Sequence, residues 1–113
     1  MARGAVRRVV ACGRGRDINA PSIRDAIVSM ARQASGKSNS TPLTFLYLGA
    51  PSFEKTDAMK LQTYGFSAVG CNVQHLHTTV LSTSPSVAQM RSAIEKADII
   101  AVSGGNTLFG IAR

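Results

Sequence analysis

Ser103, Gly104, Gly105, Asn106 and Thr107 form the stretch of this chain whose residue types could do chemistry. Glycines let the backbone turn sharply so that amide N–H groups point into open space, and such amides stabilise the oxyanion that forms when a carbonyl is attacked. Asparagine and threonine are also good types for the N-cap of a helix. Because a Gly-Gly-Asn sequence is a common turn, its role depends on the elements around it.

Ser103 lies where the nucleophile of an α/β-hydrolase lies, at a turn from strand to helix. The nucleophile elbow needs a glycine two residues before the serine, and Ala101 occupies that position. A nucleophilic serine also needs a base, and neither His75 nor His77 is expected on a loop at the carboxyl edge of a sheet. We therefore interpret Ser103 as a structural residue.

The elements that must position this stretch alternate along the chain between strands and helices. Apolar, β-branched runs predict the strands, and apolar residues recurring every three or four positions predict the helices. The first helix has Pro21 in its first turn, with Ser22 and Asp25 at capping-box spacing. The expected strands are 6–12, 43–48, 73–81 and 99–102, and the expected helices are 21–36, 55–68 and 86–97.

Alternating strands and helices predict an α/β fold with an open parallel sheet, right-handed crossovers and helices on both faces. Open sheets of this kind bind ligands at the carboxyl ends of their strands. The loops expected at that edge are 13–20, 49–54 and 103–107. This edge of the sheet is the candidate site.

Other motifs fail on their spacing. Gly13 and Gly15 follow the first expected strand, but Ile18 stands where a dinucleotide-binding GxGxxG needs its third glycine. His75 and His77 share a face of one strand, yet no third residue has the spacing of a metal ligand. We therefore expect no cofactor and no metal. Cys12 and Cys71 form no CxxC pair, and we interpret both as reduced and structural.

Composition limits the partners. The chain has 113 residues, enough for one domain, and a net charge of +7 that comes mostly from arginines in the first 32 residues. We interpret these arginines as a solvated face, with nucleic-acid binding no tighter than nonspecific. No apolar run approaches the length of a membrane span, and no signal peptide is evident. We expect a soluble, cytoplasmic protein without a membrane partner or a specific nucleic-acid partner.

The sequence from Lys96 to Thr107 closely resembles the strand and GGNT segment of the dipeptidase E family, the aspartyl dipeptidases, whose wider relatives include cyanophycinase. The upstream layout is also similar, with 43–51 followed by a helix and then by Gly70-Cys71-Asn72-Val73 at the start of a strand. Ser103 departs from the family pattern, in which a glycine is common at that place.

The resemblance implies a fold related to class I glutamine amidotransferases, which is flavodoxin-like, and a serine peptidase mechanism on short peptides such as Asp-X dipeptides. Gly105 matches the glycine whose amide helps to form the oxyanion hole, with Gly104 beside it, and Asn106 and Thr107 match neighbours expected to contact substrate. The family nucleophile lies in a G-x-S-A-G elbow after a further strand, with the histidine beyond it.

We therefore expect residues 1–113 to be the N-terminal half of a single peptidase-like α/β domain, truncated after its fourth strand and inactive alone because nucleophile and base are not in this chain. Uncovered apolar surface would then favour self-association. The alternative is a non-catalytic module that uses the same crevice or the basic face to bind a ligand.

Overall fold

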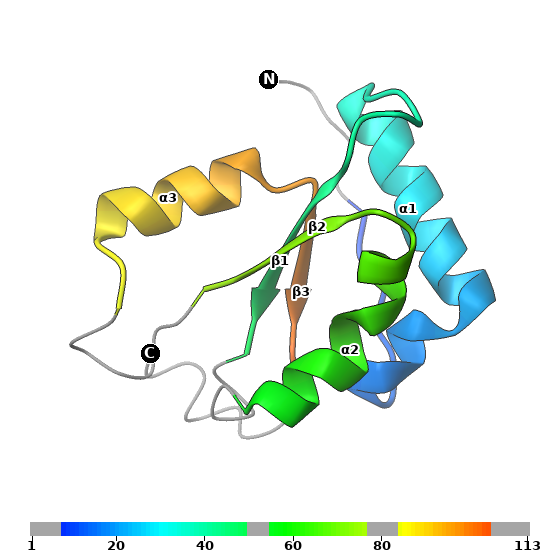
Figure 1. Ribbon diagram of the computed structural model, residues 1–113, viewed down its shortest axis with the longest axis horizontal. Helices are drawn as coiled ribbons and strands as arrows, with labels where there is room; N and C mark the ends of the chain where they lie inside the picture. Colours follow the sequence, from blue (N-terminus) through cyan, green and yellow to red (C-terminus); the bar gives the residue numbers. More distant parts are fainter. Residues whose placement is uncertain (1–7, 50–54, 77–83, 105–113) are drawn as a thin grey trace.

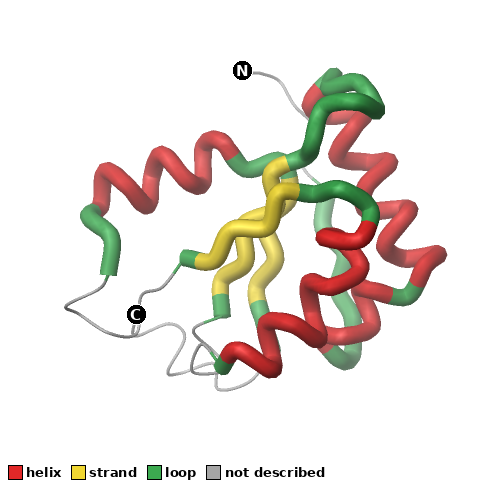
Figure 2. Tube along the Cα trace, in the orientation of Figure 1, coloured by secondary structure: helices red, strands yellow, loops and turns green. Residues whose placement is uncertain are grey.

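The structure is a computed structural model that describes residues 8–49, 55–76 and 84–104. Within these ranges a parallel sheet lies between helices, with α1 and α2 on one side and α3 on the other (Figures 1 and 2). The predicted class, an open parallel α/β fold, is confirmed. No helix within the described ranges is long and apolar enough to cross a membrane.

The sheet of the described residues has the strand order β2-β1-β3. The central strand β1 is Thr44–Leu48, and it pairs in parallel with β2, Asn72–His75, and with β3, Ile99–Val102. Because β1 has a neighbour on each side and helices over both faces, its sequence is a continuous apolar run rather than an alternating one. The expected strand 73–81 is shorter, since β2 ends at His75 and residues 77–83 lie outside the described residues.

The helices lie close to their predicted positions: α1 is Pro21–Ser35, α2 is Thr56–Ala68 and α3 is Val87–Lys96. Helix α1 ends at Gly36, whose φ of 71° is the left-handed conformation that glycine adopts without strain. The capping box expected from Ser22 and Asp25 is wrong, because α1 begins at Pro21 and has no side-chain cap. The first turn of α1 has one fewer backbone N–H that needs a hydrogen-bond acceptor, because proline has no N–H.

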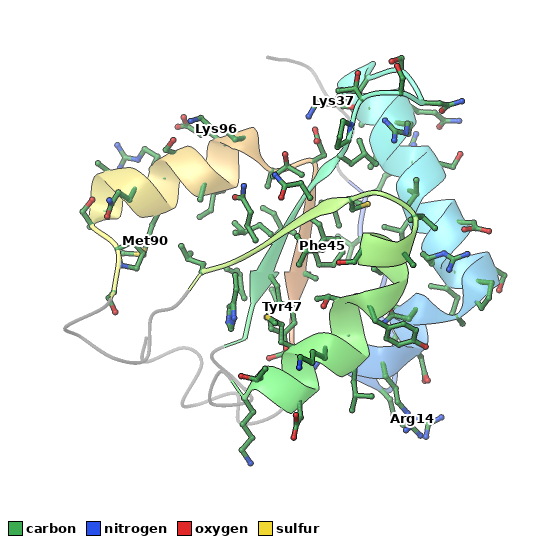
Figure 3. The ribbon with its side chains drawn as sticks, in the orientation of Figure 1. Arg14, Lys37, Phe45, Tyr47, Met90 and Lys96 are labelled. Atoms are coloured by element: carbon green, nitrogen blue, oxygen red, sulfur yellow. The ribbon has the colours of Figure 1, made fainter. Side chains whose placement is uncertain are left out.

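Three aromatic side chains form the centre of the core on the side of α1 and α2. Phe45 and Tyr47 of β1 (labelled in Figure 3) and Phe66 of α2 are fully buried, and the ring centroids of Phe45 and Phe66 lie 4.6 Å apart. Alternation along β1 puts Phe45 and Tyr47 on the same face, together with their register partners Ile99 and Ala101 of β3. This face therefore fixes how α2 packs on the sheet.

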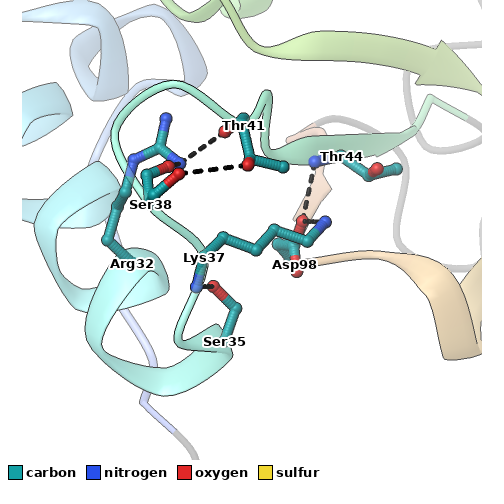
Figure 4. Close-up of polar contacts among 7 residues, drawn as sticks. All are labelled: Arg32, Ser35, Lys37, Ser38, Thr41, Thr44 and Asp98. Carbon is teal, nitrogen blue, oxygen red and sulfur yellow. Dashed lines mark hydrogen bonds and ion pairs between the residues drawn. The ribbon is translucent and has the colours of Figure 1, made fainter.

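Asp98 links the start of β3 to β1 at the amino edge of the sheet (Figure 4). Its Oδ2 accepts hydrogen bonds from the backbone N–H of Thr44 at 2.8 Å and from Lys37 Nζ at 2.6 Å, while its own N–H donates to the Thr44 carbonyl at 2.9 Å. Nearby, Arg32 donates to the carbonyls of Ser38 and Thr41 and so holds the loop before β1. The contacts of Asp98, the residue before β3, therefore hold β3 in register with β1.

The predicted loop 13–20 contains a short 3-10 helix, η1, Gly15–Asn19. Asn19 is buried, and its side chain bonds to two backbone groups of α2: its Nδ2 donates to the Leu61 carbonyl at 2.9 Å and its Oδ1 accepts from the Gly65 N–H at 2.7 Å. An α-helix pairs that carbonyl and that amide with each other. Asn19 therefore joins η1 to the middle of α2.

The first predicted strand, 6–12, is wrong for the residues that the structure describes. Residues 8–12 are not part of the sheet, and Val9 is 90% exposed. A β-branched sequence forms a strand only where a neighbouring strand supplies hydrogen-bond partners and packing. Residues 1–7, which include the start of this prediction, lie outside the described residues.

Candidate active site

The carboxyl ends of the three strands meet at one edge of the sheet, as the parallel pairing requires. The pairing continues past the ends of the outer strands, because the Leu76 N–H donates to the Tyr47 carbonyl at 3.1 Å and the Ser103 N–H donates to the Leu48 carbonyl at 3.0 Å. The residue after each outer strand is thus held against β1. This edge is where an α/β sheet offers a ligand site.

Ser103 and Gly104 are the two residues of the candidate stretch that the structure describes, directly after β3. Ser103 is buried, which fits a structural role better than that of an accessible nucleophile. Gly104 is exposed, and a Cβ added to it would meet no atom within 4 Å. Packing among the described residues therefore does not explain the glycine at 104. Gly105, Asn106 and Thr107 lie outside the described residues, so their roles stay predictions.

Tyr47 and His75 form a second feature of this edge. They are register partners on β1 and β2, and their rings meet edge to face with centroids 5.2 Å apart. Gly49 follows β1 at this point, and a Cβ there would lie 2.7 Å from Tyr47 Cε2 and 3.0 Å from His75 Nε2. Only glycine fits between these rings without displacing one of them.

The position of His75 differs from the expectation that neither histidine lies at the carboxyl edge of the sheet. The sequence predicted a strand to 81, which would have placed His75 in its first half and away from the carboxyl edge. Because β2 ends at His75, this histidine lies at the edge itself, beside the buried hydroxyl of Tyr47, which has no hydrogen-bond partner among the described residues. The apolar-polar alternation of residues 73–81 gave no sign of this end point. His77 lies outside the described residues.

A cavity of about 810 Å³ opens beside β3. Its walls include residues 8–13, residues 97–104 and apolar side chains of α1, with Phe45 and Phe66 behind them. Ser103 and Gly104 lie at the end of β3, so the cavity reaches the carboxyl edge. The sequence did not predict this space, because residues 6–12 were expected to be a paired strand.

Arg14 lies near η1 (Figure 3) and forms an exposed ion pair with Asp17 at 3.5 Å, which is weak in water. Cys12 and Cys71 are both free thiols, as expected. Burial raises the pKa of the Cys71 thiol above its ordinary value of 9.0. Among the described residues no three of His, Cys, Asp and Glu lie together as metal ligands.

The fold is that of an open parallel α/β protein, and the carboxyl edge of its sheet is the candidate site. The sequence profile of peptidase family S51 matches residues 9–110, which is most of the chain. The chain belongs to peptidase family S51. A search of curated proteins and a search of solved structures return no match to it.

Proposed function

We propose that this chain is part of a serine-type peptidase that hydrolyses short peptides, with Asp-X dipeptides as the expected substrates. The observation that carries the proposal is the family match over residues 9–110, which includes the whole candidate stretch Ser103–Thr107. The exposed Gly104 at the carboxyl edge supports it, because a backbone amide in that setting is open to a ligand.

In this proposal the serine of an elbow outside these 113 residues attacks the peptide carbonyl, and a histidine takes its proton. The Gly105 amide, with Gly104 next to it, donates to the oxyanion that forms. Asn106 and Thr107 contact the substrate. Ser103 has no chemical role, since its burial removes it from the approach of a peptide.

Hydrolysis of Asp-X dipeptides tests the proposal directly. The 113 residues alone should release no free aspartate, whereas the polypeptide extended through an elbow should. In the extended protein, Gly105→Pro removes the amide N–H, and losing one oxyanion donor costs about 10²- to 10³-fold in kcat.

Gly105→Ala is the matched control, because it adds a side chain but keeps the N–H. Circular dichroism must first show that both variants fold. A folded Gly105→Pro enzyme with normal kcat would remove Gly105 from the oxyanion hole. If both variants lose activity equally, the backbone conformation at 105 is what matters.

The second candidate function is a non-catalytic module that binds a ligand in the same crevice. The cavity of about 810 Å³ favours it, since a space of this size beside Gly104 has the volume of a ligand site. The two functions differ in one readable feature: the peptidase needs a G-x-S-x-G sequence in the polypeptide after Arg113, and the binding module does not.

A further inference from the structure

The sheet holds the backbone after β3 for one residue beyond the strand. The Ser103 N–H donates to the Leu48 carbonyl at 3.0 Å, just past the last register pair of β1 and β3, which is Leu48 and Val102. Strand β1 is the central strand of the sheet, with a neighbour on each side, so its last carbonyl is a fixed acceptor. Both strands end at the same edge (Figure 1). The sheet therefore determines where Ser103 lies.

The surroundings of the chain change between Ser103 and Gly104. Ser103 is 5% exposed, so packing holds it as well as the hydrogen bond to Leu48. Gly104 is exposed, and a Cβ added there would meet no atom within 4 Å. Among the described residues, Ser103 is thus the last one that the sheet holds before the exposed glycine.

The residue type at 103 limits the freedom of this backbone. A side chain confines φ and ψ to a few regions, whereas glycine adopts both signs of φ about equally. Ser103 directly precedes two successive glycines, Gly104 and Gly105. A third glycine at 103 would extend the permissive backbone into the edge of the sheet. With serine there, the permissive backbone begins only at Gly104.

The order of this backbone matters for the chemistry expected at Gly105. Amides stabilise an oxyanion most effectively when they are in place before the reaction, because no reorganisation is then needed as the charge develops. A residue that fixes the chain before such an amide therefore affects catalysis without contact with the substrate. Ser103 is buried, away from the approach of a peptide, and a single residue separates it from Gly105.

We propose that Ser103 is a positioning residue, which holds the backbone that carries the Gly105 amide, through Gly104, to the oxyanion. The catalytic part of this inference rests on the proposed peptidase function, and the ordering of the two glycines does not. Preorganised donors stabilise the transition state more than the bound substrate, so Ser103 contributes to kcat and not to KM.

Ser103→Gly in the extended protein tests the proposal. The variant keeps the N–H that donates to the Leu48 carbonyl and adds the conformational freedom of glycine. That freedom should lower kcat on Asp-X dipeptides about two- to fivefold, with KM unchanged. Steady-state kinetics on the folded variant gives both constants.

Two matched variants separate this effect from others. Ser103→Ala removes only the hydroxyl and keeps the Cβ, so its kcat should stay within about twofold of the unchanged enzyme. Ser67→Gly makes the same change at an exposed position near the end of α2, which leads to the start of β2 at the opposite edge of the sheet. It should lower the thermal midpoint but leave kcat unchanged.

The order of the two glycine amides can be measured independently of activity. NMR relaxation gives an order parameter for each backbone N–H, about 0.85 in rigid segments and below about 0.6 in flexible ones. In the extended protein, the order parameters of Gly104 and Gly105 should fall in Ser103→Gly. They should be unchanged in Ser103→Ala and in Ser67→Gly.

These two readouts distinguish failure of the proposal from failure of the peptidase function. If the extended protein hydrolyses no peptide, the peptidase function fails, and the order parameters alone decide whether Ser103 positions the glycines. Unchanged order parameters in Ser103→Gly overturn the proposal, and so does a normal kcat of that variant in an active enzyme. Equal losses in Ser103→Ala overturn it because the hydroxyl would then be responsible. Equal losses in Ser67→Gly overturn it because the effect would then be a general loss of stability.

Discussion

The two faces of the sheet differ in how completely helices cover them. On the side of α1 and α2, Phe45 and Tyr47 are fully buried against Phe66. On the side of α3, Ile100 and Val102 of β3 are 46% and 63% exposed, and no residue of α3 is buried. Leu46 of β1 is also buried on this second face, so the looser packing there lies along β3, where Ile100 is the register partner of Leu46. Substitutions should therefore have unequal effects on the two sides.

The largest effect is expected from Phe45→Ala. It removes a fully buried ring from the centre of the core, which costs about 3 to 5 kcal/mol of the free energy of unfolding. Ile100→Ala on the other face removes a half-exposed side chain and should cost about 1 kcal/mol. Urea unfolding followed by circular dichroism measures both. Equal losses would show that the faces contribute alike.

Breaking the hydrogen bonds between η1 and α2 should lower the free energy of unfolding by about 1 to 3 kcal/mol. These bonds lie on the face of the sheet that α1 and α2 cover. Asn19→Ala removes both hydrogen bonds to α2. Gly65→Ala should also destabilise, although alanine usually favours a helix, because its Cβ would lie 2.7 Å from Asn19 Oδ1.

The double variant distinguishes this clash from a general effect. With Asn19→Ala in place, Gly65→Ala should become neutral or stabilising by up to about 1 kcal/mol, since the obstructing oxygen is gone. Simple additivity of the two losses would mean that Asn19 and Gly65 do not interact through this contact.

The smallest effect concerns Cys71, at the start of β2. Burial keeps its thiol pKa in the folded state above 9.0, and Asp98 adds to the rise while Arg32 opposes it. The unfolded chain therefore loses this proton at lower pH than the folded chain, so stability falls as the pH rises through 9. Thermal midpoints between pH 8 and 10 should fall less in Cys71→Ala than in the unchanged protein. Cys12→Ala is the matched control and should keep the full decline.

Much of the fold was predictable because it depends on local sequence patterns. The apolar run at 43–48 and the Asp98-to-Gly104 stretch predicted β1 and β3, and proline and glycine marked the ends of α1. The part of the predicted strand 6–12 that the structure describes, residues 8–12, is not a strand, because pairing depends on a neighbouring strand and not on the valines alone.

The candidate site was predictable only in part. The carboxyl edge and the position of Ser103 and Gly104 follow from parallel topology. The meeting of Tyr47, Gly49 and His75 does not, since it depends on the register of β1 and β2 and on where β2 ends. Asn19 was also missed, because no spacing rule connects a loop asparagine with a glycine 46 residues later.

The junction of Lys37, Thr44 and Asp98 implies an order of folding. Strands β1 and β2 with α2 between them form one contiguous unit, whereas the contact of Lys37 with Asp98 closes a loop of 61 residues. Closing a longer loop costs more chain entropy, and non-local pairing is slow. The β1-α2-β2 unit should therefore form first, and β3, which also lines the cavity, should join the sheet last.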